Sequence, residues 1–507
     1  MLIQLNGSAV FGVDAHLITI EVNVDQGIGY HLVGLPDNAI KESNYRIAAA
    51  LQNIGYKLPG KKITINMAPA DLRKEGSAYD LPIALGILTA SKQIEAPTIG
   101  DYIIMGEIAL DGAIRPIKGA LPIAIQALKD GFKGFILPQE NAAEAAIVKG
   151  IAVYGITHLK EVMDFFEGKQ SLTPLTIDAR KLFAQQDKFA ALDFADVKGQ
   201  ETIKRCMEIA AAGGHNIILI GPPGAGKTML AKRLPSILPP MTLGEALETT
   251  KIHSVLGRVK ERGLVHQRPF RSPHHTISDV ALVGGGTYPQ PGEISLAHNG
   301  VLFLDELPEF KRSVLEVMRQ PLKDREVTIS RAKFTVTYPS SFMLVASMNP
   351  SPSGYFNRGT TTPVETQRYL SKISGPLLDR IDLHIEVEPV PFEDLAKKPL
   401  GEASQPIRER VTKARQIQAD RFKDFKSIHY NAQMTPKQLR AYCALDAPAK
   451  ALIKTAMDKL GLSARAYDRI LKVARTIADL AQATNLQTDH IAEAIQYRSL
   501  DREGWMG

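Results

Sequence analysis

The sequence Asn216–Thr228 reads NIILIGPPGAGKT, an apolar segment that runs directly into the pattern G-x-x-x-x-G-K-[ST]. Such a pattern is typical of a phosphate-binding loop between a strand and a helix, because glycines let successive backbone N–H groups face an anion. We expect Lys227 to reach the β- and γ-phosphates of ATP or GTP and Thr228 to ligate Mg²⁺. The residues predicted to hold the nucleotide are Gly221, Pro222, Pro223, Gly224, Ala225, Gly226, Lys227 and Thr228.

A second apolar segment, VLFLDE at Val301–Glu306, ends in two adjacent carboxylates. A buried parallel strand delivers such residues to the carboxyl edge of its sheet, where a phosphate-binding loop also lies. We expect Asp305 to hold Mg²⁺ together with Thr228, and Glu306 to polarise the attacking water. The two segments together predict a nucleotide-hydrolysing site.

The composition is that of an ordinary globular chain: 507 residues, 44% hydrophobic and 23% charged. This length indicates about three domains. Two distant cysteines, Cys206 and Cys443, exclude a disulfide framework and a cysteine-rich zinc site, and they suit a reducing compartment. The sequence lacks an export signal and an apolar run of ~18 residues, so we expect a cytoplasmic protein without a membrane partner. The net charge of +7 (61 minus 54) permits polyanion binding without demanding it.

The chain divides into three structured segments and one linker. Residues 1–170 alternate apolar strands with alanine-rich helical stretches, which predicts an α/β domain without a phosphate-binding loop. A polar linker over 171–195 precedes an α/β core over 196–395, for which we expect a parallel sheet. A proline-bearing stretch then leads into 396–507, which reads as almost entirely helical.

Further motifs surround the two predicted phosphate-site strands. The apolar segment Phe342–Pro350 (FMLVASMNP) contains Asn349 near its end, and Ser374–Leu383 (SGPLLDRIDL) sets Arg380 between two aspartates. Together with DVKGQ before the core and GLSARAYDRILKVARTIADL after it, these segments resemble the AAA+ ATPases.

The AAA+ resemblance implies roles for three residues. Asn349 would be sensor 1, Arg380 the arginine finger, and Arg465 the sensor-2 arginine. An arginine finger stabilises charge on the transferring phosphoryl group and, in this family, usually comes from the neighbouring subunit. The alternatives are a local ion pair of Arg380 with Asp379 or Asp382, and a solvated helix position for Arg465.

The sequence distance from Lys227 to Asp305 is 78 residues (305 minus 227), more than a single helix and strand require. The excess contains FRSPHHTISDVALVGGGTYPQPGEISLAHNG, residues 270–300, which is rich in Gly, Pro and His and indicates a loop-bearing insert. A second feature, DREVTISRAKFTVTYPS at 324–340, alternates apolar and polar residues on both sides of a short basic turn. This alternation predicts a β-hairpin with a basic tip.

Both features resemble the helix-2 insert and the pre-sensor-1 hairpin of one AAA+ branch, which holds replicative helicases and the magnesium-chelatase motor subunit. In those helicases such hairpins line the pore of a ring and grip the DNA backbone. The resemblance implies that basic residues at the tip and base of the hairpin bind DNA phosphates. These residues are Arg331, Lys333, Lys323 and Arg325. The alternative is a solvated hairpin with ordinary surface charge.

The whole chain resembles the ComM/YifB family of magnesium-chelatase-like AAA+ ATPases. The N-terminal motifs GLPDNAIKES, PADLRKEGSAYDLPIA and GEIALDGAIRPIKGALP carry this resemblance, together with the helical motif that contains Arg465. It implies a hexameric ring that uses ATP and Mg²⁺, moves along single-stranded and branched DNA, and drives branch migration in natural transformation. Recombination or DNA-uptake proteins would be further partners.

Two places in the sequence invite a metal interpretation. Many relatives carry a cysteine-rich segment after the sensor-1 strand, but NPSPSGYFNRGTTTP at 349–363 contains none, so we expect no zinc there. His274, His275 and His298 have no cysteine nearby and form no i, i+4 pair on a helix. We therefore expect these histidines to serve loop structure or nucleic-acid contact.

The N-terminal segment is also similar to the Lon protease domain. Aligning RKEGSAYD on the Lon serine motif puts Ala78 at the nucleophile and Leu121 at the catalytic lysine, while Ser77 and Lys118 are displaced. A serine without a base at hydrogen-bond distance is not activated, so we expect no proteolysis. We expect this domain to support ring assembly or to bind DNA.

Composition and spacing alone predict an oligomeric ATPase with a basic hairpin. Beside the DNA translocase, two functions stay open. One is a motor of the magnesium-chelatase type that remodels a partner protein, and the other is a nucleotide-gated scaffold that does not depend on hydrolysis.

Overall fold

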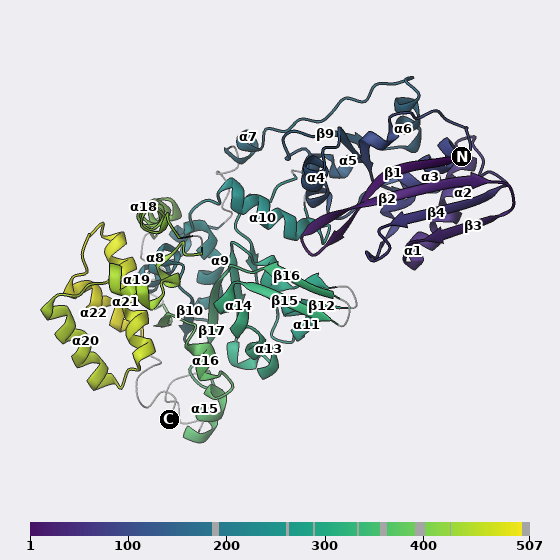
Figure 1. Ribbon diagram of the computed structural model, residues 1–507. Helices are drawn as coiled ribbons and strands as arrows, with labels where there is room; N and C mark the ends of the chain where they lie inside the picture. Colours follow the sequence, from purple (N-terminus) through teal and green to yellow (C-terminus); the bar gives the residue numbers. More distant parts are fainter. Residues whose placement is uncertain are drawn as a thin grey trace. The chain divides into compact units, whose positions relative to one another are not determined.

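The computed structural model describes residues 1–184, 192–259, 263–286, 289–331, 334–354, 362–390, 401–425 and 427–498. The chain splits into two compact units (Figure 1). Unit 1 comprises Met1–Asp187 and Thr242–His266, and unit 2 comprises Lys188–Met241 and Gln267–Gly507.

Unit 1 is built on a seven-stranded sheet with the order β3-β4-β2-β1-β5-β8-β9. Its strands are β1 (Leu2–Phe11), β2 (Asp14–Asp25), β3 (Gly29–Val33), β4 (Lys62–Ala68), β5 (Tyr102–Ile104), β8 (Gly134–Pro138) and β9 (Ala152–Ile156). β1 and β2 form a long antiparallel hairpin, and β5, β8 and β9 extend the sheet in parallel. Along β2 the apolar residues Ile18, Ile20 and Val22 alternate with polar ones, which buries one face of the strand.

The helices of unit 1 pack their apolar residues against this sheet. They are α1 (Asn38–Lys41), α2 (Ser43–Asn53), α3 (Asp80–Ala90), α4 (Ala120–Lys129), α5 (Gln139–Ala145) and α6 (Leu159–Phe166), with the short strands β6 (Glu107–Ile108) and β7 (Ile114–Arg115) between α3 and α4. The short helix α7 (Ala179–Ala184) also belongs to this unit. The sequence of α3, DLPIALGILTA, is apolar nearly all round, and every residue of this helix is buried. Gly86 lets α3 approach the sheet, because a β-carbon there would lie 2.6 Å from a methyl group of Val22.

A helix from the middle of the chain belongs to unit 1. This helix, α10 (Leu243–Ser254), begins at a capping box in which Thr242 and Glu245 satisfy each other's backbone N–H groups. At its end the Ser254 carbonyl accepts a hydrogen bond from the backbone N–H of Gly119 (3.0 Å), and the Ser254 hydroxyl donates to the buried carboxylate of Glu144. Residues 242–266 thus pack with the N-terminal part of the chain, although they lie within the range 196–395 of the predicted core.

Unit 2 contains a five-stranded, wholly parallel sheet with the order β11-β14-β17-β10-β18. Its strands are β10 (Ile217–Ile220), β11 (Phe270–Arg271), β14 (Val301–Leu304), β17 (Met343–Met348) and β18 (Leu383–Glu386). The residues of β10, β14 and β17 are buried throughout, as expected for strands covered on both faces. Because the strands run in parallel, the residues that follow them gather at a single edge of the sheet.

Short elements surround the sheet of unit 2. The helices are α8 (Glu201–Gly213), α9 (Lys227–Ile237), α11 (Asp279–Val283), α12 (Glu293–Leu296), α13 (Arg312–Val317), α14 (Arg319–Asp324), α15 (Pro363–Leu370) and α16 (Gly375–Leu378), and η4 (Leu307–Glu309) is a 3-10 turn. The strands β12 (Gly284–Gly285) and β13 (Gln290–Pro291) form a small ladder in the insert, and β15 (Glu326–Arg331) pairs with β16 (Phe334–Pro339) in the predicted hairpin.

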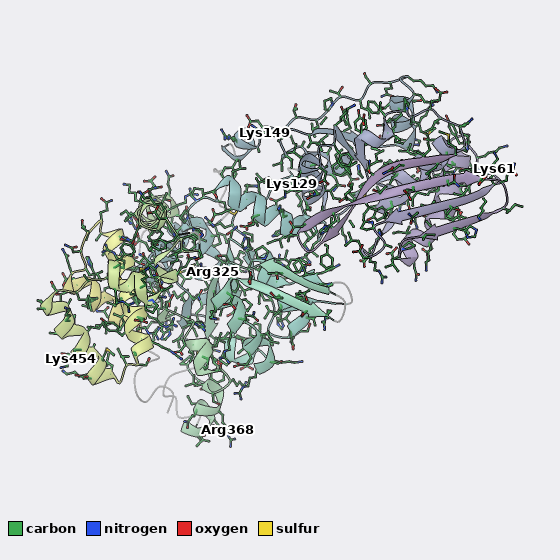
Figure 2. All side chains as sticks on the ribbon, in the orientation of Figure 1. Lys61, Lys129, Lys149, Arg325, Arg368 and Lys454 are labelled. Carbon is green, nitrogen blue, oxygen red and sulfur yellow. The ribbon has the colours of Figure 1, made fainter. Side chains whose placement is uncertain are left out.

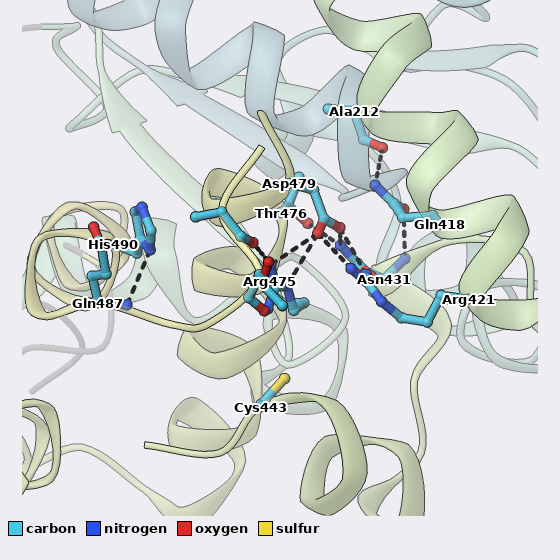
Figure 3. Close-up of polar contacts among 12 residues, drawn as sticks. Ala212, Gln418, Arg421, Asn431, Cys443, Arg475, Thr476, Asp479, Gln487 and His490 are labelled. Carbon is cyan, nitrogen blue, oxygen red and sulfur yellow. Dashed lines mark hydrogen bonds and ion pairs between the residues drawn. The ribbon is translucent and has the colours of Figure 1, made fainter. Parts of the chain in front are cut away.

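The C-terminal region is helical, with α18 (Ser404–Phe422), α19 (Pro436–Tyr442), α20 (Ala447–Leu460), α21 (Ala464–Leu480) and α22 (Thr488–Gln496). A buried polar network joins α21 to α18 (Figure 3). Asp479 accepts hydrogen bonds from Arg421, Arg475 and Asn431, so its charge is fully paired. Gln418 extends the network by donating to the Ala212 carbonyl at the end of α8. Removing one member would leave a buried polar group unsatisfied, so the network fixes α21 against the core.

The fold class predicted from the sequence is confirmed: an α/β chain with a parallel-sheet core, an insert, a hairpin and a helical C-terminal region. Within the described ranges, none of the helices combines the length and apolar character that crossing a bilayer requires.

Candidate nucleotide-binding site

The predicted phosphate-binding loop connects β10 to α9 at the carboxyl edge of the unit 2 sheet. Gly224 (φ 80°) and Gly226 (φ 89°) adopt the left-handed conformation that glycine tolerates without strain. Gly221 is required for a different reason, because a β-carbon there would lie 2.2 Å from the Val387 carbonyl oxygen. The loop is therefore held close to β18, and the first turn of α9 starts with Lys227.

Lys227 lies buried within this loop. Its ammonium group donates hydrogen bonds to the carbonyls of Gly221 (2.6 Å) and Pro222 (3.0 Å) and to Oδ1 of Asn349 (3.1 Å). Burial lowers the pKa of Lys227, and the nearby charges of Asp305 and Glu306 partly oppose this shift. A lysine so placed can exchange neutral carbonyl partners for phosphate oxygens, which bind an ammonium group more strongly.

Thr228 and Asp305 meet directly beside Lys227. The Thr228 hydroxyl donates to Oδ2 of Asp305 (2.8 Å), and the Ser347 hydroxyl donates to Oδ1 of the same carboxylate. Hydroxyl and carboxylate oxygens are hard ligands that suit Mg²⁺, which binds through one or two protein groups and fills its other positions with phosphate oxygens and water. In the described part of the chain, no cluster of three or more His, Cys, Asp or Glu could hold a metal. The residues present therefore fit a magnesium ion that arrives with a nucleotide.

Glu306 stands next to this pair with an unusual backbone conformation. Its φ of 54° lies in the left-handed region, which is uncommon for residues other than glycine. Its backbone N–H donates to the Ser347 hydroxyl (3.2 Å), and its side chain is 53% exposed. The bend turns the Glu306 carboxylate away from the strand direction, so two adjacent acids can serve different tasks.

His275 lies next to Glu306, a position that was not predicted from the sequence. Its Nδ1 lies 3.6 Å from Oε2 of Glu306, and its ring lies against the rings of His274 (4.1 Å between centroids) and Phe310 (6.4 Å). The histidine follows β11 by four residues, and β11 is a parallel strand beside β14, so both reach the same edge. The two-residue length of β11 concealed this placement in the sequence.

Asn349 completes the group at the carboxyl edge. It follows β17 directly, between the loop after β10 and the acids after β14. The structure thus brings together five of the predicted site residues: Lys227, Thr228, Asp305, Glu306 and Asn349.

Arg380 and Arg465 lie at the opposite edge of the same sheet. Arg380 precedes β18, and its carbonyl accepts a hydrogen bond from the Asn216 side chain at the start of β10 (2.8 Å). The length of β10, four residues at ~3.3 Å each, separates this position from the phosphate-binding loop by about 13 Å. Arg465, which is 74% exposed, pairs with Asp379 next to Arg380. Both arginines are thus remote from the loop of their own chain.

The local ion-pair alternative for Arg380 does not match its surroundings. Asp379 pairs with Arg465, and Asp382 pairs with His215 and Arg469. Within the residues that the structure describes, the Arg380 side chain makes no ion pair, and its Nε is buried without a hydrogen-bond acceptor.

The hairpin β15–β16 has one buried and one exposed face. Val327, Ile329, Val336 and Tyr338 are buried, while hydroxyl pairs such as Thr328 with Thr337 line the outer face. Arg331 is exposed at the end of β15, and Lys333 lies outside the described residues. Lys323 is 65% exposed at the base, whereas Arg325 is half-buried inside unit 2 (Figure 2). Arg325 therefore does not share the exposed surface of the hairpin.

The other histidines and the protease-like residues have structural partners. His274 contacts the Thr276 hydroxyl (2.9 Å), and Nδ1 of the buried His298 accepts from the backbone N–H of Ser341 (3.0 Å). In unit 1 the Ser77 hydroxyl donates to Glu107, whereas the side chain of Lys118 lies against Gly257. These contacts give Ser77 a carboxylate partner instead of a lysine.

The chain is similar to known proteins over nearly its whole length. The family profile described as "Magnesium chelatase, subunit ChlI" matches residues 193–395, and related profiles match 20–141 ("Subunit ChlI of Mg-chelatase") and 401–498 ("Magnesium chelatase, subunit ChlI C-terminal"). The chain is 46% identical to YifB of Salmonella typhimurium over 500 residues, covering 97% of this chain and 96% of YifB. It is 45% identical to the competence protein ComM of Haemophilus influenzae over 498 residues, covering 97% of each. It is also 29% identical to Lon protease 2 of Bacillus subtilis over 182 residues, 32% of each chain, which fits the Lon-like character predicted for the N-terminal segment.

The identity to these relatives extends over nearly the whole length of the chain. The phosphate-binding loop, the paired acids and the helical C-terminal region are also present. Together these findings identify the family. The chain belongs to the ComM/YifB family of magnesium-chelatase-like AAA+ ATPases.

Proposed function

We propose that this protein is an ATP-driven, ring-forming motor that moves along DNA and drives branch migration of recombination intermediates, in a role of the ComM type. The observation that carries this proposal is the division of the predicted catalytic residues between two edges of one sheet. Lys227 and Glu306 stand at the carboxyl edge, and Arg380 stands at the amino edge. Because the chain's own arginine is remote from its own loop, a second copy must supply it, as in a closed ring with head-to-tail contacts. A hexamer is the number that the family resemblance implies.

The residues would divide the reaction as follows. The loop N–H groups and Lys227 hold the phosphates, and Thr228 with Asp305 holds the Mg²⁺ that neutralises phosphate charge. Glu306 orients and polarises the attacking water, and Asn349 contacts the same water or the γ-phosphate. Arg380 of a neighbouring copy stabilises the developing charge, with Arg465 beside it. Hydrolysis would then depend on assembly.

The hairpin is the proposed DNA-binding element. Arg331 is exposed at its tip, and neighbouring Lys333 carries a second charge that a ring would repeat in every subunit. Contacts to phosphates are independent of base sequence, which suits a motor that must pass along any DNA. The names of the relatives support this direction, since ComM of Haemophilus influenzae is a competence protein.

Steady-state ATP hydrolysis tests the proposal. The purified protein is assayed without DNA, with single-stranded DNA, with duplex and with a four-way junction, and Lys227→Ala serves as the blank. We expect single-stranded or branched DNA to stimulate hydrolysis strongly, and we expect the blank to stay inactive. Hydrolysis that depends on Lys227 but ignores every DNA would refute the DNA motor.

A second candidate is a motor that remodels a partner protein. The observation in its favour is that all three matching family profiles describe a subunit of magnesium chelatase. Stimulation of ATP hydrolysis by a partner protein, together with indifference to DNA, would support it. If Glu306→Gln left the biological activity intact, neither motor would hold, and a nucleotide-gated scaffold would remain.

A further inference from the structure

A cavity of about 250 Å³ in unit 2 is lined by an excess of positive charge. Five arginines and two lysines line it, against a single carboxylate, Asp382. The cavity lies at the amino ends of the parallel strands, where Asn216 precedes β10 and Met343 begins β17, and the helices α18 and α21 supply its other side. It is therefore separated from the phosphate-binding loop by the length of the strands.

Among the described residues, two of these arginines have no partner that neutralises their charge. In the part of the chain that the structure describes, the side chains of Arg325 and Arg380 make neither a hydrogen bond nor an ion pair, and Nε of Arg380 is buried. A guanidinium group carries five donors in a fixed planar fork and stays protonated in proteins. Because buried donors in folded proteins almost always have acceptors, the buried Nε of Arg380 indicates a ligand that supplies oxygen atoms, and the half-buried Arg325 lines the same cavity.

The neighbouring cations Lys472, Arg415 and Arg469 are held by contacts with other residues of unit 2. Lys472 donates to the Ala432 carbonyl (2.9 Å), and Arg415 donates to the Ala211 carbonyl (2.8 Å) while it stacks on Tyr430 (3.7 Å to the ring centroid). Arg469 pairs with Asp382 (2.6 Å), but that carboxylate is shared with His215. The carbonyl contact fixes Lys472 without cancelling its charge, and the single carboxylate of Asp382 is divided between Arg469 and His215.

Burial makes this charge unfavourable in the absence of an anion. It lowers the pKa of Lys472, and it lowers the pKa of Arg325 to about 10. Among the charged residues that line the cavity, cations outnumber carboxylates, so an anion in the cavity would stabilise them. The volume of about 250 Å³ is large enough to accommodate a phosphate group.

We propose that this cavity binds a phosphate group, held by the forks of Arg325 and Arg380 and the ammonium of Lys472. A phosphate presents several oxygens around one centre and carries more than one negative charge, which matches forks and an ammonium group better than a single carboxylate does. Two sources share this chemistry: the terminal phosphates of a nucleotide on a second copy of this chain, and the backbone of a nucleic acid. The first source rests on the proposed function, in which Arg380 acts on the nucleotide of a neighbouring copy. Phosphate binding at this place does not itself require hydrolysis, so the titrations below do not depend on the motor.

Titration calorimetry with pyrophosphate tests the site directly. The Lys227→Ala protein removes the lysine of the phosphate-binding loop, and Arg325→Gln or Lys472→Gln is added to it. The matched control is Lys454→Gln, an exposed lysine on the outer helix α20, away from Arg325 (Figure 2). Arg325→Gln breaks no hydrogen bond or ion pair among the described residues, so its fold should persist, and circular dichroism with thermal unfolding checks this.

We expect Lys227→Ala to retain pyrophosphate binding, the control to leave Kd unchanged, and each cavity substitution to raise Kd about tenfold, as the loss of one charge-assisted contact predicts. Absence of binding in Lys227→Ala, or unchanged binding in the Arg325→Gln variant, would overturn the proposal. If the proposed motor function were wrong, DNA would not stimulate ATP hydrolysis. The results of these pyrophosphate titrations would not change.

Two further measurements distinguish the sources, with the Lys227 loop intact. If a second copy's nucleotide is the occupant, Arg325→Gln weakens ATP-dependent assembly in sedimentation velocity and leaves single-stranded DNA affinity unchanged. If nucleic acid is the occupant, the same variant leaves assembly intact and reduces the salt dependence of DNA binding by about one phosphate contact. A variant that changes neither property excludes both sources and overturns the site as a functional one.

Discussion

Mixing two inactive variants tests whether one subunit completes the site of another. Lys227→Ala disables the phosphate-binding loop and keeps Arg380, whereas Arg380→Ala keeps the loop and removes the arginine. The four residues of β10 place these positions about 13 Å apart at opposite sheet edges, so neither variant can repair itself within its own chain. A complete site forms only where a subunit with an intact loop contacts a neighbour that retains Arg380.

The expected recovery of ATPase activity follows from the fraction of subunit interfaces that combine an intact loop with an intact arginine. Arg380→Ala alone should lose about 10³-fold in kcat, the lower end of what an arginine finger contributes. In an equal mixture that assembles at random, about one quarter of the sites (one half times one half) combine an intact loop with an intact arginine. The mixture should therefore reach about 25% of wild-type hydrolysis, roughly 10² times the activity of either variant alone.

The assay is phosphate release at fixed total protein, with the two variants mixed before ATP is added. Arg440→Ala, which removes an exposed arginine on α19, is the control and should keep wild-type activity. Activity of the mixture equal to the sum of the separate variants would refute sharing of the site. Wild-type activity of Arg380→Ala alone would refute the finger itself.

Three further predictions follow from single contacts. His275→Ala should leave the KM for ATP unchanged and raise basal kcat by less than about fivefold, because the partly exposed contact between the two side chains restrains Glu306 by ~1 kcal/mol or less; steady-state kinetics measures this. Gly221→Ala should weaken binding of a fluorescent ATP analogue about tenfold or more, since the new β-carbon meets the Val387 carbonyl and overpacking costs about 1–3 kcal/mol. Burial alone would raise the pKa of Asp382, but the hydrogen bond from His215 and the charge of Arg469 outweigh it and hold that pKa below its usual range. The stabilisation that ionised Asp382 contributes to the folded state is therefore present above an unfolded pKa of about 4, and it is lost as pH falls below that value. In urea unfolding from pH 7 to pH 3, the free energy of unfolding of Asp382→Asn should depend less on pH than that of the wild type.

Each of these predictions has an outcome that contradicts it. A changed KM in the His275→Ala protein would mean that the histidine supports binding instead of restraining Glu306. Normal nucleotide affinity in Gly221→Ala would show that the loop can move away from β18. An Asp382→Asn protein whose stability depends on pH as strongly as the wild type would assign the acid sensitivity to other carboxylates.

The carboxyl edge of unit 2 could be anticipated from the sequence because its parts are continuous in the chain. The loop before Lys227 and the acids after β14 each follow an apolar strand directly, and parallel strands must end at a common edge. The hairpin followed from strict alternation of apolar and polar residues across a short turn. In each of these cases a local pattern determines where the side chain lies.

Other features depend on packing between distant segments, which no local pattern records. β11 is two residues long, so neither its place in the sheet nor the approach of His275 to Glu306 could be read from periodicity. Arg325 lies next to the exposed hairpin in sequence, yet it is half-buried and lines a cavity together with residues of α18 and α21. The roles of Arg380, Arg465 and Arg331 stay predictions, because they concern a second subunit and DNA.

The membership of α10 in unit 1 has a practical consequence for any attempt to dissect this protein. The chain leaves unit 1 after Asp187, returns at Thr242 and departs again after His266, so no single cut separates the two units. A truncation that begins near residue 190 would strip α10 of its neighbours and bare the buried side chains of Ala246 and Ile252 to water. Expression of residues 1–187 alone would in turn leave the Glu144 carboxylate without the hydroxyl of Ser254. Loss of solubility in such fragments would therefore result from disruption of unit 1. It would not show which of the two units carries the activity.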